Sequence, residues 1–199
     1  MLMRAFHTVR YRVTNMFGKA ALRRKGVKLG IGVGLNGLPI VTMAKESAIE
    51  LGEKVVLCSE SYSTDLGVSR PVILRTLRPG ARISIGKNSG LSGTVICAAV
   101  EVIIGAECLF GADVTIVDTD FHAIRAQGRR NNTNPDDIAA LPISIADNVF
   151  VGAGSIILKG VSIGKNSIVG AGSVVTKNVP ENVVVAGNPS RVVKKIETS

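Results

Sequence analysis

The chain has 199 residues, and its 24 Lys and Arg exceed its 15 Asp and Glu to give a formal charge of +9. This length predicts a single domain with room for one appendage. Aromatic residues are only 4% of the chain and Trp is absent, while hydrophobic residues reach 46%; strands rich in Ile, Val, Leu and Ala are therefore favoured over an aromatic core. The longest uncharged apolar stretch, 29–44, is too short and too rich in Gly to span a membrane.

The excess charge belongs to the first quarter of the chain. Nine Lys and Arg and no acidic residue precede Glu46, whereas residues 46–199 carry 15 of each sign. Within residues 1–28 the apolar positions recur at intervals of three and four, which predicts a basic amphipathic helix. The members of this stripe are Leu2, Phe6, Val9, Val13, Met16, Phe17 and Ala20.

Three roles for residues 1–28 are compatible with this pattern. The helix can cap the open end of the domain that follows it, attach peripherally to an anionic membrane, or serve as an Arg-rich transit peptide. Nucleic-acid binding is not expected, because the neutral remainder of the chain offers no basic groove.

A repeat of six residues dominates the last third of the chain. Every sixth position from Ile145 to Val175 is Ile or Val, and the residue after it is mostly small. A period of six fits neither a helix nor a simple alternating strand; it fits a short strand and a tight turn, repeated as a solenoid. The positions are Ile145, Val151, Ile157, Ile163, Val169 and Val175.

The same repeat occurs upstream with interruptions. Ile85, Leu91 and Cys97 share one register, while Ile104, Phe110 and Ile116 share another that is displaced by one residue. Leu51 and Leu57 form an earlier pair, and residues 59–83 fit the repeat poorly. The three cysteines (Cys58, Cys97 and Cys108) are odd in number and far apart, which indicates reduced thiols that pack as small apolar residues.

One long polar segment leaves the repeat after His122 and returns near Leu141. A loop of this length, ejected from a tight solenoid, is a candidate binding element. It begins beside Asp118, Asp120 and His122, three side chains suited to acid–base chemistry. The two aspartates can orient the imidazole or the substrate, or they can simply stabilise turns.

Residues 145–192 resemble the hexapeptide-repeat acyltransferases, and in particular the C-terminal halves of galactoside, maltose and polysaccharide O-acetyltransferases. The resemblance covers residues 80–195 well and 29–79 loosely. It implies an all-β solenoid, a left-handed parallel β-helix of hexapeptide repeats preceded by the amphipathic helix. The hand comes from the resemblance alone, since ordinary crossover rules favour the right-handed form. The repeat length predicts six or seven coils.

The resemblance also implies chemistry. His122 matches the histidine that takes a proton from the acceptor while the acceptor attacks the thioester of acetyl-CoA, and Asp118 and Asp120 are its candidate partners. The small residues Ala153 and Ala171 would line the groove for the pantetheine arm. Positive or polar residues would face the nucleotide end of the cofactor: Thr176, Lys177, Arg191 and Lys194.

We therefore expect a cytoplasmic homotrimer with active sites shared between subunits, which moves an acetyl group to a hydroxyl of a sugar or glycan precursor. Association with a membrane through residues 1–28 stays open. N-acetylation of an amino sugar and a non-catalytic β-helix scaffold are the alternatives. No metal is expected: related zinc enzymes of this fold need three histidines, and this chain has only His7 and His122. The expected division is a helical segment at 1–28, the β-helix at 29–191 with its active-site loop at 121–141, and a tail at 192–199.

Overall fold

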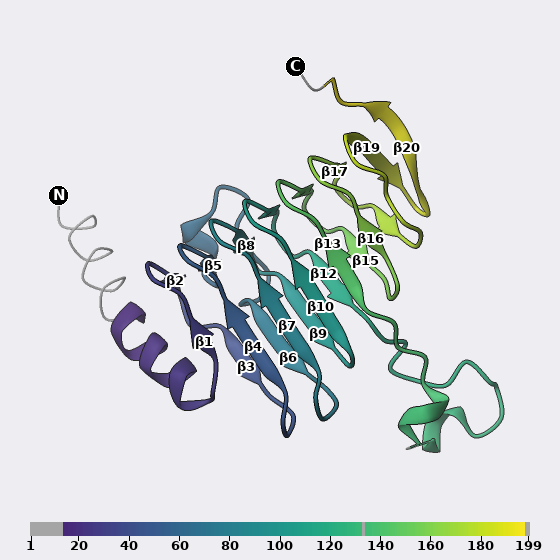
Figure 1. Ribbon diagram of the computed structural model, residues 1–199, viewed down its shortest axis with the longest axis horizontal. Coiled ribbons are helices and arrows are strands. Elements are labelled where there is room, and N and C mark those ends of the chain that lie inside the picture. The colour runs from purple at the N-terminus through teal and green to yellow at the C-terminus, as the bar shows by residue number, and fades with distance from the viewer. Residues whose placement is uncertain (1–13, 133, 198–199) are drawn as a thin grey trace.

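The computed structural model describes residues 14–132 and 134–197, and these form a three-sided solenoid of parallel strands (Figure 1). Each side is one parallel sheet, and the chain passes from sheet A to sheet B to sheet C in every coil. Sheet A contains β1 (Lys28–Leu29), β4 (Ala48–Leu51), β7 (Arg82–Ile85), β10 (Glu101–Ile104), β13 (Ile143–Ile145) and β16 (Ser162–Ile163).

Sheets B and C complete the six coils that the described residues make. Sheet C contains β3 (Ile40–Thr42), β6 (Ile73–Thr76), β9 (Val95–Ala98), β12 (Thr115–Val117), β15 (Ile156–Ile157) and β18 (Val174–Val175). Sheet B contains β2 (Gly34–Asn36), β5 (Val56–Cys58), β8 (Gly90–Ser92), β11 (Leu109–Phe110), β14 (Phe150–Val151), β17 (Ile168–Val169), β19 (Val183–Gly187) and β20 (Ser190–Lys195).

The six-residue repeat is the inward row of this solenoid. All six aliphatic positions from Ile145 to Val175 are buried, and each lies in register with its counterpart one coil away. For example, Ile157 of β15 pairs with Ile116 of β12 on one side and with Val175 of β18 on the other. Branched side chains stacked in this way fill most of the interior, and Phe110 is the aromatic residue among the described members of the core cluster.

The register between β8 and β9 differs from the expected one. Leu91 is buried as expected, but the next inward residue is Ile96, which pairs with Ile116. Cys97, which we placed in the row, pairs instead with Val117. The step here is five residues, because the chain turns tightly at Gly93 with a positive φ of 55°. The next step, from Ile96 to the inward Ile104 of β10, is eight residues long, so the two irregular corners together produce the one-residue displacement seen in the sequence.

Small residues at the corners allow the coils to approach each other. A Cβ added to Gly152 would lie 2.5 Å from the backbone nitrogen of Ala171, so only glycine fits there. Buried serines satisfy backbone carbonyls at these corners: the Ser155 hydroxyl donates to the Gly170 carbonyl over 3.0 Å, and Ser167 donates to the Pro180 carbonyl over 2.6 Å. Hydrogen bonds between coils therefore close these corners, while buried valines such as Val149 and Val161 fill others.

A helix spanning 14–24 lies across the N-terminal end of the solenoid, against the first coil (Figure 1). The Asn15 side chain donates to the Leu35 carbonyl over 2.9 Å and accepts from the Leu35 N–H over 3.0 Å, as a neighbouring strand would. Leu22 is buried in the core cluster. The helix thus caps the end of the solenoid. The expected stripe from Leu2 to Val13 lies outside the described residues.

At the other end, β19 and β20 form an antiparallel hairpin that continues sheet B. Asn188 and Pro189 join these two strands. Because β20 runs to Lys195, it crosses the boundary expected after residue 191, and residues 192–195 of the expected tail belong to this strand. In the described ranges, no helix has the length and apolarity needed to cross a membrane.

We expect Ile157→Ala to lower the free energy of unfolding by about 2–5 kcal/mol, because it leaves a cavity in the stacked row. The matched control is Ile156→Ala on the same strand, whose side chain points away from the core and is half-buried. Urea denaturation monitored by circular dichroism measures both variants. Equal losses for the two would contradict the assignment of the inward row.

Candidate active site

The long polar loop leaves the solenoid at the corner between sheets C and A, after β12 in the fourth coil. Its two ends are held together at a short neck. Thr119 and Ala140 form an antiparallel bridge, the Asp120 N–H donates to the Ala139 carbonyl over 3.0 Å, and the Leu141 N–H donates to the Asp118 carbonyl over 2.9 Å. The loop is therefore anchored at the place where the repeat was expected to break.

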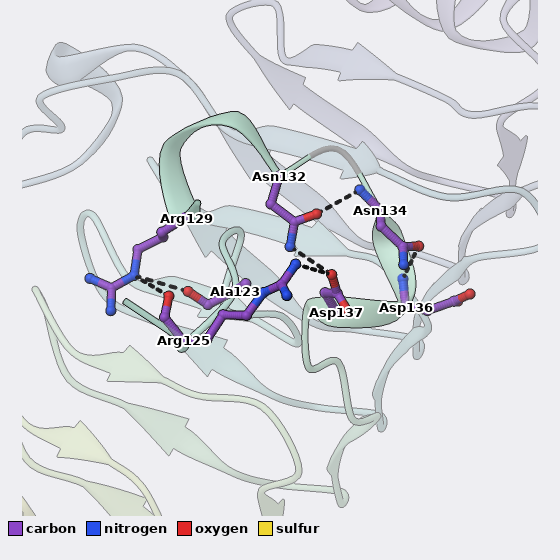
Figure 2. A network of polar contacts seen from close by, with 7 residues as sticks. All are labelled: Ala123, Arg125, Arg129, Asn132, Asn134, Asp136 and Asp137. Atoms are coloured by element: carbon purple, nitrogen blue, oxygen red, sulfur yellow. Dashed lines mark hydrogen bonds and ion pairs between the residues drawn. The ribbon is translucent and has the colours of Figure 1, made fainter. Parts of the chain in front are cut away.

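Polar contacts within the loop give it a defined shape, as Figure 2 shows. It contains the short 3₁₀ turns η2 (Arg129–Asn131) and η3 (Pro135–Asp137). The Asp137 carboxylate accepts from the Arg125 guanidinium over 2.7 Å and from the Asn132 amide over 3.0 Å. The Arg129 guanidinium donates to the Ala123 and Ile124 carbonyls. The loop is thus a structured element and not an unordered insertion.

The loop is also tied to an earlier coil. Arg78, which follows β6 two coils toward the N-terminus, donates to the Pro135 and Ile138 carbonyls over 3.0 and 2.9 Å. A hollow of about 200 Å³ lies between this arginine and the loop neck. Its lining residues are Leu77, Arg78, Ala99, Thr119, Phe121, Pro135 and Ile138.

His122 lies at the root of the loop, and its side chain is exposed. The preceding residue, Phe121, has a positive φ of 61°, so the chain reverses direction at this point. In the described part of the chain, no hydrogen bond or ion pair holds the imidazole. An exposed imidazole of this kind is open to an external proton donor or acceptor.

Asp118 is fully buried, and its carboxylate closes a corner of the preceding coil. It accepts from the backbone N–H groups of Ala99, Val100 and Glu101 over 2.6, 2.7 and 2.8 Å. Burial raises the pKa of the Asp118 carboxyl, while these donors and the Arg78 guanidinium oppose the rise. All of its neighbours donate, so the arrangement suits the ionised form. Among the described residues, no hydrogen bond joins Asp118 to His122.

Asp120 pairs with Lys159, a residue that no sequence pattern indicated. Its Oδ1 accepts from the Lys159 Nζ over 2.7 Å, and both side chains are about three-quarters buried. Its Oδ2 is buried and has no hydrogen-bond partner among the described residues. Lys159 follows β15 and Asp120 follows β12, so the two residues occupy the same corner in successive coils. Aligning the hexapeptides of these two coils in the sequence would have placed Lys159 beside Asp120.

Four of the six expected cofactor residues lie at two edges of the solenoid, and Arg191 and Lys194 lie on β20 of sheet B. Ala153 and Ala171 are stacked at the corner between sheets B and C, where the Gly172 N–H donates to the Ala153 carbonyl over 2.8 Å. Thr176 and Lys177 follow β18 at the corner between sheets C and A, the edge from which His122 also projects. One whole face of the solenoid, sheet C, separates the two sets.

A hollow lies beside each of the two edges, one next to Ala153 and one next to Lys177. Ala153 lines an open groove of about 680 Å³ between its corner and residues 61–69, which form the excursion between β5 and β6 and contain η1 (Ser61–Ser63). The Ser69 N–H donates to both oxygens of Asp113 over 3.1 Å and holds this excursion in place. Lys177 and Arg191 share a hollow of about 230 Å³, whereas Lys194 lines another of about 400 Å³.

The described residues contain no group of three or more His, Cys, Asp or Glu placed to hold a metal ion. The three cysteines are free thiols. Burial raises the pKa of Cys97 and of Cys108, which keeps both thiols protonated near neutral pH. They accordingly pack as small apolar residues, as we expected.

Comparison with known proteins defines the class of the chain. A family model described as the hexapeptide repeat of succinyl-transferase matches residues 101–117 and 142–177. Galactoside O-acetyltransferase of Lactococcus lactis is 42% identical over 99 residues, which is 50% of this chain and 45% of that protein. The chain spans about half the length of the curated relatives that it matches.

Two solved structures resemble this one. A galactoside acetyltransferase in complex with coenzyme A is 37% identical, with a TM-score of 0.56 over 65% of this chain and 62% of that one. A hexapeptide-repeat acetyltransferase from Vibrio cholerae, complexed with acetyl coenzyme A, is 29% identical with a TM-score of 0.53, covering 58% and 61% of the two chains.

Residues 101–117 and 142–177 thus match the hexapeptide-repeat model, and the described residues have the parallel β-helix fold of these two structures, a class whose solved members are left-handed. Within that class it resembles the sugar O-acetyltransferases, as residues 145–192 indicated.

The three contacts of Asp118 lead to a stability test. We expect Asp118→Asn to destabilise the protein by about 1–3 kcal/mol, because an amide of the same shape turns its NH₂ group toward buried N–H donors. The matched control is Asp147→Asn, an exposed aspartate whose Oδ1 accepts from the Ala106 N–H over 2.7 Å. Urea denaturation compares the two variants. A loss no larger than that of the control would contradict the structural role of Asp118.

Proposed function

We propose that the protein is an acetyl-CoA-dependent O-acetyltransferase acting on a sugar or glycan precursor. The observation that carries the proposal is the position of His122, an exposed imidazole at the root of the long loop, in a chain that resembles galactoside O-acetyltransferases along its C-terminal coils.

In the proposed reaction, His122 removes the proton of the acceptor hydroxyl. The oxygen attacks the carbonyl carbon of the acetyl thioester, a carbon–oxygen bond forms, and the carbon–sulfur bond breaks. The thiolate of coenzyme A then takes up the proton that the imidazole carried. Imidazole suits this exchange because it can both accept and return a proton near neutral pH.

The two aspartates have different roles in this proposal. Asp118 holds the corner of residues 99–101 and so fixes the base of the loop from beneath. Asp120, paired with Lys159, stands beside the neck and sets the direction in which His122 leaves it. Neither carboxylate needs to contact the imidazole in order to position it.

Acetyl-CoA would be bound by groups from both edges of the solenoid. The backbone beside Ala153 and Ala171 offers an open groove for the pantetheine arm, and the hollow shared by Lys177 and Arg191 offers positive charge for phosphates. Thr176 lies beside the second hollow, and Lys194 would contribute from the hairpin.

The separation of the two edges supports a homotrimer. Since a full face lies between Ala153 and His122 within one chain, a cofactor seated against Ala153 reaches an imidazole most directly from a neighbouring subunit. Each active site would then combine the sheet B–C edge of one subunit with the loop of the next. The free cysteines support a reducing compartment such as the cytoplasm.

Replacement of the proposed base gives the first test of function. We expect His122→Gln to lower kcat about 10²- to 10⁴-fold while coenzyme A binding is retained, because only the proton transfer is lost. Release of the coenzyme A thiol, measured with a panel of sugar hydroxyl and amino-sugar acceptors, follows the rate, and calorimetry follows binding. Activity within a few-fold of the parent protein would refute the role of His122, and preference for an amine would redirect the proposal to N-acetylation.

A mixing experiment tests the shared site. We expect His122→Gln and Ala153→Trp each to be inactive alone, the first without a base and the second with its groove filled. When they are co-expressed, about a quarter of the interfaces in randomly mixed trimers should combine an intact histidine with an intact groove and recover activity. Thermal unfolding checks that each variant folds. No recovery above the two parents would place the whole site within one subunit.

A further inference from the structure

In the described part of the N-terminal helix, two residues of the predicted apolar stripe face away from the solenoid. The residues that pack against the first coil are Asn15, Gly18 and Leu22, all buried. Met16 and Phe17, which belong to the predicted stripe, are 63% and 64% exposed. Because the capping contact is made by the opposite face, the cap does not account for these apolar side chains.

Basic residues flank this exposed apolar face. Arg23 and Arg24 are exposed and Lys19 is half-buried, and no ion pair engages any of the three in the part of the chain that the structure describes. By contrast, Lys25 donates to the Val41 carbonyl and Lys28 pairs with Glu50. Lys19, Arg23 and Arg24, which make no ion pair among the described residues, thus lie on the same helix as Met16 and Phe17.

Further apolar side chains lie at the same end of the solenoid. Ile31 and Leu38, from two corners of the first coil, are 81% and 61% exposed. Leu38 lies next to the helix, since a Cβ on Gly18 would come within 2.9 Å of its side chain. The N-terminal end therefore combines large apolar groups with positive charge. The acidic side chains that lie against the first coil include Glu50, which is paired with Lys28, and Glu60, which lies beside Gly37.

We propose that this end of the protein docks on an anionic membrane surface. Met16 and Phe17 would enter the boundary between headgroups and acyl chains, while Lys19, Arg23 and Arg24 reach the lipid phosphates. A second copy of the helix is a poorer occupant, because it would bring the same positive charges together. The proposal is independent of the acetyltransferase activity proposed above.

Docking at this end leaves the candidate active site open. The loop leaves the fourth coil, three coils beyond the first. At a spacing of about 4.8 Å per coil, this places it roughly 15 Å from the first coil, on the side of the solenoid and not at its end. The loop and the membrane surface would therefore not compete for the same residues.

The absence of Trp makes a direct experiment possible. Phe17→Trp introduces a single fluorophore into the full chain, and its emission should shift to shorter wavelength with vesicles of phosphatidylglycerol and phosphatidylcholine but not with phosphatidylcholine alone. Brominated lipids should quench it. The matched control is Phe150→Trp on β14, a partly exposed position that lies four coils away; its emission should not change.

Charge reversal tests the same surface by co-sedimentation with the anionic vesicles. Arg23→Glu with Arg24→Glu should weaken binding by about tenfold or more, whereas Lys194→Glu with Lys195→Glu, at the opposite end, should have little effect. Thermal unfolding checks that both variants fold. Three results would each overturn the proposal: equal binding to neutral vesicles, an unshifted emission from the Phe17→Trp variant, or a loss of self-association instead of a loss of vesicle binding.

Discussion

The stacking of each coil on the one before it, side chain on side chain, is the constraint that determines the rest of this structure. Because Ile116, Ile157 and Val175 occupy equivalent places in successive coils, no coil can shift without opening a cavity in both neighbours. An insertion in the chain can therefore project from the solenoid only at a corner between two sheets, where the side chains are small. The excursion at residues 61–69 and the loop after Thr119 both do so, and the candidate site is consequently built at edges rather than on faces.

This constraint explains what could be predicted from the sequence. The inward row from Ile145 to Val175 and the departure of the loop near His122 followed directly from the period of six. The register at Cys97 was wrong because a five-residue corner at Gly93 preserves the composition of the repeat while shifting its phase. Lys159 was missed because it lies 39 residues from Asp120 and meets it only through stacking. The backbone contacts of Asp118 were hidden for the same reason.

The N-terminal helix shows what hydrophobic patterning leaves open. The apolar stripe did not decide which face of the helix packs on the solenoid, and the face that does so contains a polar residue, Asn15, and a glycine. The end of a β-helix presents unpaired backbone groups as well as apolar surface, and an amide side chain satisfies both a donor and an acceptor there. A polar residue, Asn15, is therefore buried against the solenoid. The apolar side chains of Met16 and Phe17 are exposed and can contact another surface.

The Asn15 contact also limits what the protein can assemble into. A solenoid of parallel strands has no natural stopping point, and an uncovered end strand can recruit the end strand of another molecule. By occupying the N–H and the carbonyl of Leu35, the amide removes the pairing site that a further coil, or a foreign strand, would use on β2. The hairpin of β19 and β20 turns sheet B antiparallel at the other end. The repeat sets the length of six coils, and these two end contacts oppose the end-to-end association of solenoids into fibres.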